Sequence, residues 1–324
     1  MIREGFPLDM KKILTLLLLW ALALGLLAGC VPNGANIQEN TVTFTDALDR
    51  EVSVSKAPQR VAALLGSFAD VWVLSGGTLC AAAEDAWEDF GLELPGAVNI
   101  GGAHSPSLEL LLSADPDFVI ASASTASNVE MREVLEAAGI AVAYFDVDHF
   151  EDYLEMLRIC TDITGRKDLF EANGLEIQKQ IQKIKGAVAE AGLSDRQKTV
   201  LVLRAASGFV KAKGSTGTIL GEMLSDLGCI NIADSDTSLL DNLSVESVIR
   251  QEPYHIFVVT MGSNPQKAMD NLSQMFRENP AWGTLEAVKE NRVHVMERTL
   301  FNIKPNGRWA QSYETLEKIL LTTE

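Results

Sequence analysis

Cysteine is scarce in this chain of 324 residues, which contains only four. Cys30 closes an N-terminal apolar stretch, and Cys80, Cys160 and Cys229 lie far apart inside apolar segments. An odd number of cysteines cannot all pair, and no C-x-x-C spacing occurs. We therefore expect no disulfide framework, and we interpret the last three cysteines as buried small hydrophobic side chains.

Histidine is equally scarce, and the four histidines are scattered along the sequence. His255 and His294 lie within strand-like runs, and His149 opens a helical stretch, so we expect sheet, core or solvated side chains there. Only His104, in a glycine-rich loop, is a candidate axial ligand to iron. A zinc or manganese site needs two or three histidines together with Asp or Glu, so the pattern predicts no site for a bare metal ion.

The sequence also lacks the motifs of common exported enzymes. It contains no G-x-S-x-G, no H-E-x-x-H and no G-x-G-x-x-G after a strand-like run. The Gly/Ser-rich segment 214–218 has no P-loop lysine, and it is typical of a turn before a helix whose backbone N–H groups can face an anion. We therefore expect a protein that is not an enzyme and has no cofactor.

Basic residues are outnumbered, because 44 Asp and Glu face 27 Lys and Arg, for a formal net charge of −17. Such a chain is a poor candidate for binding nucleic acid or an anionic membrane surface. The acidic residues are spread along the sequence, which indicates solvated faces. A hydrophobic fraction of 47% is enough for two lobes with cores of their own.

No apolar run is long enough for a comfortable membrane span. Lys11 and Lys12 precede an apolar run over residues 13–27, which is shorter than the roughly 20 residues a span needs. The run ends in Leu-Ala-Gly-Cys at Cys30, and the whole resembles a bacterial lipoprotein signal. We expect residues 1–29 to be removed, with Met10 the better start. Lipidated Cys30 would anchor the protein on the extracytoplasmic face of the membrane, and residues 30–40 would form a tether.

From residue 41 onward, strand-like apolar runs alternate with helical patterns, which favours an α/β fold with mainly parallel sheets. Residues 41–55 form two alternating runs around a turn, typical of a hairpin. The buried-strand candidates that follow share short length and β-branched or aromatic content, and they lie at residues 61–65, 118–121, 142–145, 200–203, 256–260 and 293–296.

One stretch differs, because residues 169–193 contain no strand-like run. Ile177, Ile181, Ile184 and Val188 recur at helical spacing, with Lys and Glu on the other face. A helix of about 25 residues spans about 37 Å, which suits a strut between two lobes. We therefore predict an N-terminal lobe at 41–166, a connecting helix at 167–193 and a C-terminal lobe at 194–324.

An internal repeat supports two similar lobes. The segments 107–120 and 244–257 match in a Ser, a Glu two residues later, an acidic residue and a Pro, all at a spacing of 137 residues. In each copy, the Ser is expected to cap a helix whose first turn holds Glu109 or Glu246. Proline then ends the helix before a buried strand.

These features together resemble the iron-siderophore, haem and cobalamin class of ABC-transporter substrate-binding proteins. The resemblance lies in the opening segment 42–64, the repeat and the closing segment 281–320. It implies a binding domain over about residues 58–324. Asp49 stands where the family commonly has glycine, but Asp tolerates a left-handed turn. The resemblance implies two lobes joined by a rigid helix, with a ligand cleft between them.

The resemblance also implies partners. Glu109 and Glu246 match the positions at which the family docks on arginine pockets of a permease, which works with an ATPase. The alternative is that each carboxylate only stabilises the first turn of its helix. We expect a monomer that binds one small molecule and touches the membrane through its lipid.

The ligand should lie at the loops beyond the carboxyl ends of the strands. Aromatic rings there can stack on a ligand, and cations can meet an anionic chelate. For Trp309 the alternative is a helix-start residue packed on the core, and for Arg308 a surface ion pair. The candidates are Ser67, Phe68, Trp87, His104, Arg204, Phe209, Met261, Phe301, Lys304, Arg308 and Trp309.

The sequence therefore predicts a solute-binding lipoprotein of an ABC importer. Its transported ligand would be an iron-siderophore chelate, haem or a cobalamin, and the sequence does not choose among these. The alternatives are a zinc- or manganese-binding protein of an ABC importer and an exported enzyme.

Overall fold

The computed structural model describes residues 40–262 and 264–322. The predicted signal at 1–29, Cys30 and the tether as far as residue 39 lie outside this part of the chain. None of the helices within it is long and apolar enough to cross a membrane. From Val42 onward the chain packs as one unit, which contains two separate five-stranded sheets.

The unit opens with a two-stranded hairpin made of β1 (Thr41–Thr45) and β2 (Glu51–Ser55). The Oδ1 atom of Asp46 accepts hydrogen bonds from the backbone N–H groups of Leu48, at 3.0 Å, and Arg50, at 3.1 Å. Asp49 adopts the left-handed conformation with φ 56°, as the turn requires. The predicted hairpin is therefore confirmed, with Asp in place of glycine.

The first large sheet is entirely parallel among its described pairings and has the order β5-β4-β3-β6-β7. Its strands alternate with short helices, as β-α-β units require. The strands are β3 (Val61–Ala63), β4 (Leu79–Ala82), β5 (Val98–Asn99), β6 (Phe118–Ser122) and β7 (Ala141–Phe145). The helices are α2 (Gly66–Leu74), α3 (Asp85–Glu88), α4 (Leu108–Ser113), α5 (Ala126–Glu130) and α6 (Arg132–Ala137).

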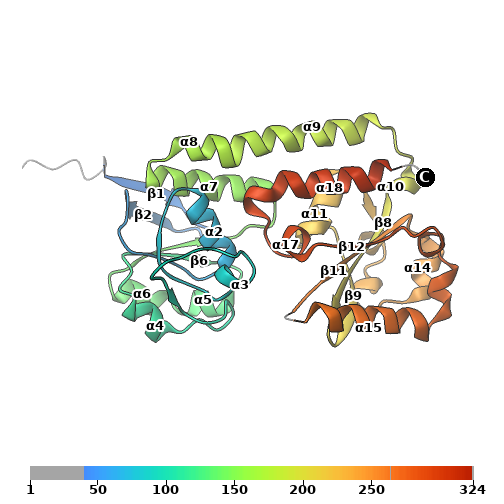
Figure 1. Cartoon of the computed structure of the whole chain (residues 1–324), viewed down its shortest axis with the longest axis horizontal. Helices are drawn as coiled ribbons and strands as arrows, with labels where there is room; N and C mark the ends of the chain where they lie inside the picture. The colour runs from blue at the N-terminus through green and yellow to red at the C-terminus, as the bar shows by residue number, and fades with distance from the viewer. Residues whose placement is uncertain (1–39, 263, 323–324) are drawn as a thin grey trace, which may run out of the picture. The chain divides into compact units, whose positions relative to one another are not determined.

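The second large sheet has the order β10-β8-β11-β12, with β9 added antiparallel to β8. Its strands are β8 (Thr199–Ala206), β9 (Phe209–Lys213), β10 (Ile230–Asn231), β11 (His255–Thr260) and β12 (Val293–Met296). The surrounding helices include α11 (Ile219–Asp226), α12 (Ile232–Ser235), α13 (Ser238–Asp241), α14 (Val245–Gln251), α15 (Pro265–Glu278), α16 (Glu286–Lys289) and α17 (Arg298–Phe301). Two α/β lobes with mainly parallel sheets are thus confirmed (Figure 1).

The central strands β3, β6 and β11 are buried on both faces, which explains why they appear as continuous apolar runs. In β6, Phe118 and Ile120 pack into one hydrophobic cluster, whereas Val119 and Ala121 pack into another on the opposite face. The alternation of side chains along a strand produces this division.

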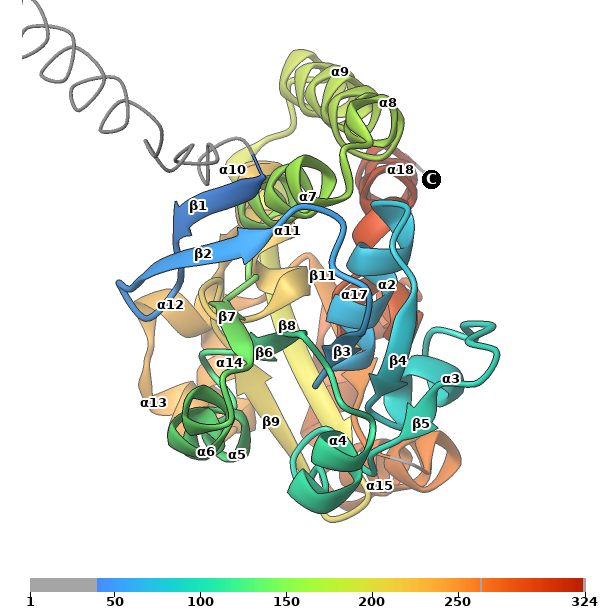
Figure 2. The same ribbon diagram turned by 90° about the vertical axis from the view of Figure 1, so that its left-hand side faces the viewer.

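A long helical segment connects the lobes. It consists of α8 (Lys167–Phe170), a π-helical turn (Glu171–Leu175) and α9 (Glu176–Glu190), preceded by α7 (Phe150–Thr164). The predicted stripe of Ile177, Ile181, Ile184 and Val188 is buried. The segment lies alongside α18 (Trp309–Leu321), which Figure 2 shows nearly end-on. Residues 166 and 193 remain predicted boundaries.

The π-helical turn fixes this segment to the first lobe. The hydroxyl of Tyr153 in α7 donates to the carbonyl of Asn173 at 2.7 Å, and the Asn173 amide donates to the carbonyl of Leu74 at 2.9 Å. A Cβ on Gly174 would lie 2.8 Å from Leu154 Cδ1, so a larger residue would require the Leu154 side chain to shift. The strut therefore starts from a rigid attachment.

Candidate functional site

The best candidate for a ligand surface is the β8–β9 hairpin at the carboxyl edge of the second sheet. Arg204 on β8 pairs with Lys211 on β9, and Val202 pairs with Lys213. Residues directly opposite each other in an antiparallel pair share a face of the sheet, and side chains two apart on one strand also do. Arg204, Lys211 and Lys213 therefore lie on one face, and we call them the basic strip.

The basic strip carries positive charge that the protein itself does not neutralise. Within residues 40–262 and 264–322, none of the three side chains makes an ion pair, and the Nε atom of Arg204 is buried without a hydrogen-bond partner. Burial lowers the pKa of Arg204, and burial together with the charges of Arg204 and Lys211 lowers the pKa of Lys213. Like charges opposed on neighbouring strands destabilise a sheet, so an anion bound here would be stabilising.

Two large apolar side chains accompany the basic strip. Phe209, opposite Ala206 on the same face, is 40% exposed, and Met261, directly after β11, is 43% exposed. The Nζ atom of Lys211 lies 5.5 Å from the centroid of the Phe209 ring. Exposed rings and methyl groups beside cations suit an organic anion with apolar parts.

The structure places three predicted aromatic contacts in the core. Phe68, Phe301 and Trp309 are each 1% exposed, and Trp309 packs edge-on against Phe150 with ring centroids 5.9 Å apart. The expectation that these rings stack on a ligand is therefore wrong for this structure. The alternative for Trp309, a helix-start residue packed on the core, describes its environment.

Asn306, which the sequence analysis missed, fastens the turn before Trp309 to α2. Its amide donates to the carbonyl of Ser67 at 2.7 Å and to a carboxylate oxygen of Asp70 at 2.9 Å, both on α2. Asn306 is 1% exposed and left-handed, with φ 50°. The Asn-Gly pair at 306–307 is a turn signal that could have pointed to it. Because this turn is fastened to α2, Ser67 is buried as well.

The two predicted cations of the same loop have local partners. Lys304 is partly buried, which lowers its pKa, and its Nζ atom lies 5.9 Å from the centroid of the Phe68 ring. Arg308 donates to the carbonyl of Thr299 at 3.3 Å and lies 3.8 Å from the Glu297 carboxylate. The surface ion pair expected as the alternative for Arg308 is thus present.

On the first lobe, Trp87 is half-buried in α3 and packs against the core, whereas His104 is exposed in its loop. Nearby, Asp85 accepts a hydrogen bond from the Gly66 N–H at 2.9 Å, and its other carboxylate oxygen is buried without a partner. Burial raises the pKa of Asp85. Axial ligation by His104 remains a prediction.

The two docking candidates occupy matched positions. Ser107 and Ser244 cap α4 and α14, each hydroxyl oxygen accepting a backbone N–H at 3.3 Å, as the repeat predicted. Glu109 and Glu246 are exposed in the first turns. Glu246 also accepts a hydrogen bond from the Ser244 hydroxyl at 2.9 Å. Their role in docking remains a prediction.

The scattered histidines are not all far apart in space. His255 and His294 meet at the opposite, amino-terminal edge of the second sheet, with Nδ1 of His255 3.0 Å from Nε2 of His294. No group of three or more His, Cys, Asp or Glu side chains able to hold a metal ion occurs in the described ranges. This pair could not be predicted from the sequence, because 39 residues separate its two members.

Comparisons with known proteins agree with the two-lobed fold. The family model described as periplasmic binding protein matches residues 61–299. The Fe(3+)-citrate-binding protein YfmC of Bacillus subtilis is 24% identical over 320 residues, covering 96% of each chain. The putative ABC transporter substrate-binding lipoprotein YhfQ of the same organism is 22% identical, covering 91% of this chain and 93% of its own.

Among solved structures, the siderophore-binding protein BauB superposes with a TM-score of 0.70 at 17% identity, covering 88% of this chain and all of its own. That structure holds two molecules of acinetobactin and ferric iron. At 17% identity, this similarity shows only that the two folds are alike. Because the family model spans most of the chain, the protein belongs to the periplasmic binding protein family of solute-binding proteins.

Proposed function

We propose that this chain is the extracytoplasmic, lipid-anchored solute-binding protein of an ABC importer, and that its cargo is a negatively charged iron chelate. The basic strip carries this proposal, because three cations without ion-pair partners lie together at the carboxyl edge of the second sheet. Relatives named for ferric citrate and for a siderophore support the same chemical class.

The basic strip would recognise carboxylate or similar oxygen anions at the periphery of the chelate. The guanidinium of Arg204 is planar and can bind a carboxylate through two hydrogen bonds, whereas Lys211 and Lys213 act as point charges. Phe209 and Met261 would contact apolar parts of the same ligand. Haem, which carries two carboxylates, and a corrinoid are the alternative cargoes.

Ferric citrate, haemin and cyanocobalamin can be titrated separately into the protein, with quenching of tryptophan fluorescence as the measurement. We expect ferric citrate to bind most tightly of the three. Arg204→Gln and Lys211→Gln should each weaken it about tenfold or more, since a hydrogen bond to a charged group contributes roughly 1.5–3 kcal/mol. Lys183→Gln, an exposed charge on α9, is the matched control and should bind normally.

Two results would argue against this cargo. One is ferric citrate affinity that stays unchanged in both strip variants. The other is cyanocobalamin binding more tightly than ferric citrate. Partly exposed ion pairs weaken when salt screens them. A ferric citrate affinity that does not fall with added salt would therefore also argue against this cargo.

The anchor needs its own test, since Cys30 lies outside the described residues. Cys30→Ala should release the protein from membranes, because an acylated cysteine would be its attachment. Membrane fractionation after a salt wash measures this. A variant that still sediments with the membranes would show that lipidation is not the anchor.

A further inference from the structure

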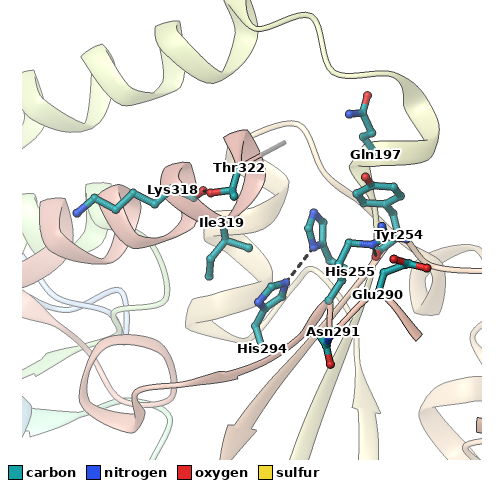
Figure 3. Close-up of a pocket in the computed structure, with 10 residues that line it drawn as sticks. Gln197, Tyr254, His255, Glu290, Asn291, His294, Lys318, Ile319 and Thr322 are labelled. Atoms are coloured by element: carbon teal, nitrogen blue, oxygen red, sulfur yellow. Dashed lines mark hydrogen bonds between the residues drawn. The ribbon is translucent and has the colours of Figure 1, made fainter. Parts of the chain in front are cut away.

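His255 and His294 form a close pair on adjacent parallel strands at the amino-terminal edge of the second sheet. His255 is the first residue of β11, and His294 lies on β12 in register with Phe257. The two rings are 5.1 Å apart at 47°, and one nitrogen of each faces the other at 3.0 Å (Figure 3). Both residues lie on strands of one ladder, which fixes the separation of their backbones.

The pair is accessible from solvent through a pocket of about 480 Å³. The C-terminal end of α18 and the loop before β12 form its walls, and His255 and His294 line it (Figure 3). Its other lining residues are largely polar and include Gln197, Tyr254, Glu290, Asn291, Lys318 and Thr322. An ion with its bound water can therefore reach the two imidazoles.

Both imidazoles are available as ligands near neutral pH. Burial, followed by the charges of His294 and Arg292, lowers the pKa of His255 to about 4, and burial and Arg292 lower the pKa of His294. A neutral imidazole has one nitrogen with a lone pair and one with a proton, and one of the two facing nitrogens carries the proton of their hydrogen bond. Metal binding therefore requires that ring to move its proton to its other nitrogen.

The nearby cation Arg292 is held by neighbouring groups. Its guanidinium makes an ion pair with the Glu286 carboxylate at 2.6 Å and lies 3.8 Å from the centroid of the Tyr254 ring. Its Nε atom donates to the carbonyl of Tyr254 at 3.0 Å. The ion pair and the hydrogen bond hold the guanidinium in place, and Glu286, which also pairs with Arg196, offsets part of its charge.

The distance between the ligating nitrogens is close to what one metal ion requires. Imidazole nitrogens lie about 2.0–2.1 Å from Zn²⁺, so two of them in a tetrahedral arrangement are roughly 3.3 Å apart. The rings would move apart by a few tenths of an ångström from 3.0 Å. One neutral hydrogen bond would be exchanged for two metal–nitrogen bonds.

We propose that His255 and His294 bind one divalent transition-metal ion of the kind that prefers nitrogen ligands, such as Cu²⁺, Ni²⁺ or Zn²⁺. Water from the pocket completes the coordination, because no third His, Cys, Asp or Glu joins the pair within the described part of the chain. The bound ion would cross-link β11 and β12. The site lies at the edge of the sheet opposite the basic strip, so it is independent of the transported cargo.

The test uses the full-length protein without a polyhistidine tag, purified in detergent and stripped of metal. Cu²⁺ alone is titrated at neutral pH, and electron paramagnetic resonance counts the coordinating nitrogens. We expect one Cu²⁺ per chain with two imidazole nitrogens. His294→Gln, at the partly exposed position, should bind at least tenfold more weakly, and His104→Gln, at an exposed site in the first lobe, should match the wild type.

A second measurement keeps the outcome decisive. An ion that binds only the folded state raises the thermal midpoint, so Cu²⁺ should raise it for the wild type and for His104→Gln but not for His294→Gln. Unchanged Cu²⁺ affinity in His294→Gln, a spectrum with fewer than two imidazole nitrogens, or loss of binding in His104→Gln would each overturn the proposal. His255→Gln repeats the test, and its outcome is read only if its circular dichroism matches the wild type.

Discussion

Asp115 and Glu252, 137 residues apart in sequence, adopt the same left-handed backbone conformation, with φ 49° and 47°. Each follows a helix capped by serine and precedes a proline and a buried strand, β6 or β11. A left-handed residue other than glycine costs roughly 1–2 kcal/mol. The two copies of the repeat therefore carry backbone strain at matched positions. Both lobes turn the chain from helix to strand in the same way.

Glu252→Gly should stabilise the protein by up to about 1 kcal/mol. Glycine removes the left-handed strain, and this outweighs its larger entropy loss on folding of roughly 0.5–1 kcal/mol. Glu252 is exposed, so little packing is lost. Denaturant unfolding measures the change, and Glu314→Gly, within the exposed face of α18, is the control that should destabilise by about 1 kcal/mol. A destabilised Glu252→Gly would show that φ 47° carries no strain.

Asn306→Ala should destabilise the protein by about 2–3 kcal/mol. The substitution removes the hydrogen bonds to Ser67 and Asp70 and leaves a residue with Cβ at φ 50°. Asn306→Gly loses the same bonds but tolerates the backbone, so it should cost about 1 kcal/mol less. Equal stability of the wild type and Asn306→Ala would mean that the turn is not held by this side chain.

Stability of the metal-free protein should fall as the pH drops below about 6.5. The unfolded chain has a His255 pKa near 6.5, whereas the folded pKa is about 4, so the unfolded state binds a proton that the folded state does not. The stabilising contribution of neutral His255 is present above pH 6.5 and is lost progressively towards pH 4. The loss should reach roughly 2–3 kcal/mol.

Denaturant unfolding at several values between pH 7 and pH 5 measures this dependence, in a range above most carboxylate titrations. His294→Gln should show a smaller decline, because one titrating imidazole and the neighbouring charge are removed. His104→Gln, whose imidazole is exposed, should decline as the wild type does. If the free energy of unfolding fell equally steeply with pH in His294→Gln and in the wild type, the pH dependence would not arise from the histidine pair.

Glu109→Ala combined with Glu246→Ala should abolish most iron uptake in cells that depend on this protein. The two exposed carboxylates occupy matched first turns, and truncating one partner of a charge pair at an interface commonly costs several-fold to many-fold in binding. Ligand affinity and the thermal midpoint of the purified double variant should stay near those of the wild type. Glu314→Ala is the control at a comparable exposed helix position, and normal uptake in the double variant would refute docking.

The sequence by itself determined the features that depend on local patterns. Short continuous apolar runs gave the buried strands, and the Ile177–Val188 stripe gave the long helix. The serine caps and prolines gave the repeated helix–strand turns. Each of these rests on residues within a few positions of one another, so propensity and periodicity suffice. The alternation of Phe209, Lys211 and Lys213 with smaller residues is also typical of a strand with one polar face, and these residues form β9.

Only the tertiary structure decided which distant residues meet. The hairpin register set Lys211 opposite Arg204, and the parallel pairing of β11 with β12 set His255 beside His294. Asn306 bonds to Ser67 across 239 positions, and Phe68, Phe301 and Trp309 pack into the core. Such contacts depend on strand register and lobe packing, which local sequence does not encode because the free energy that fixes them comes from the whole assembled core.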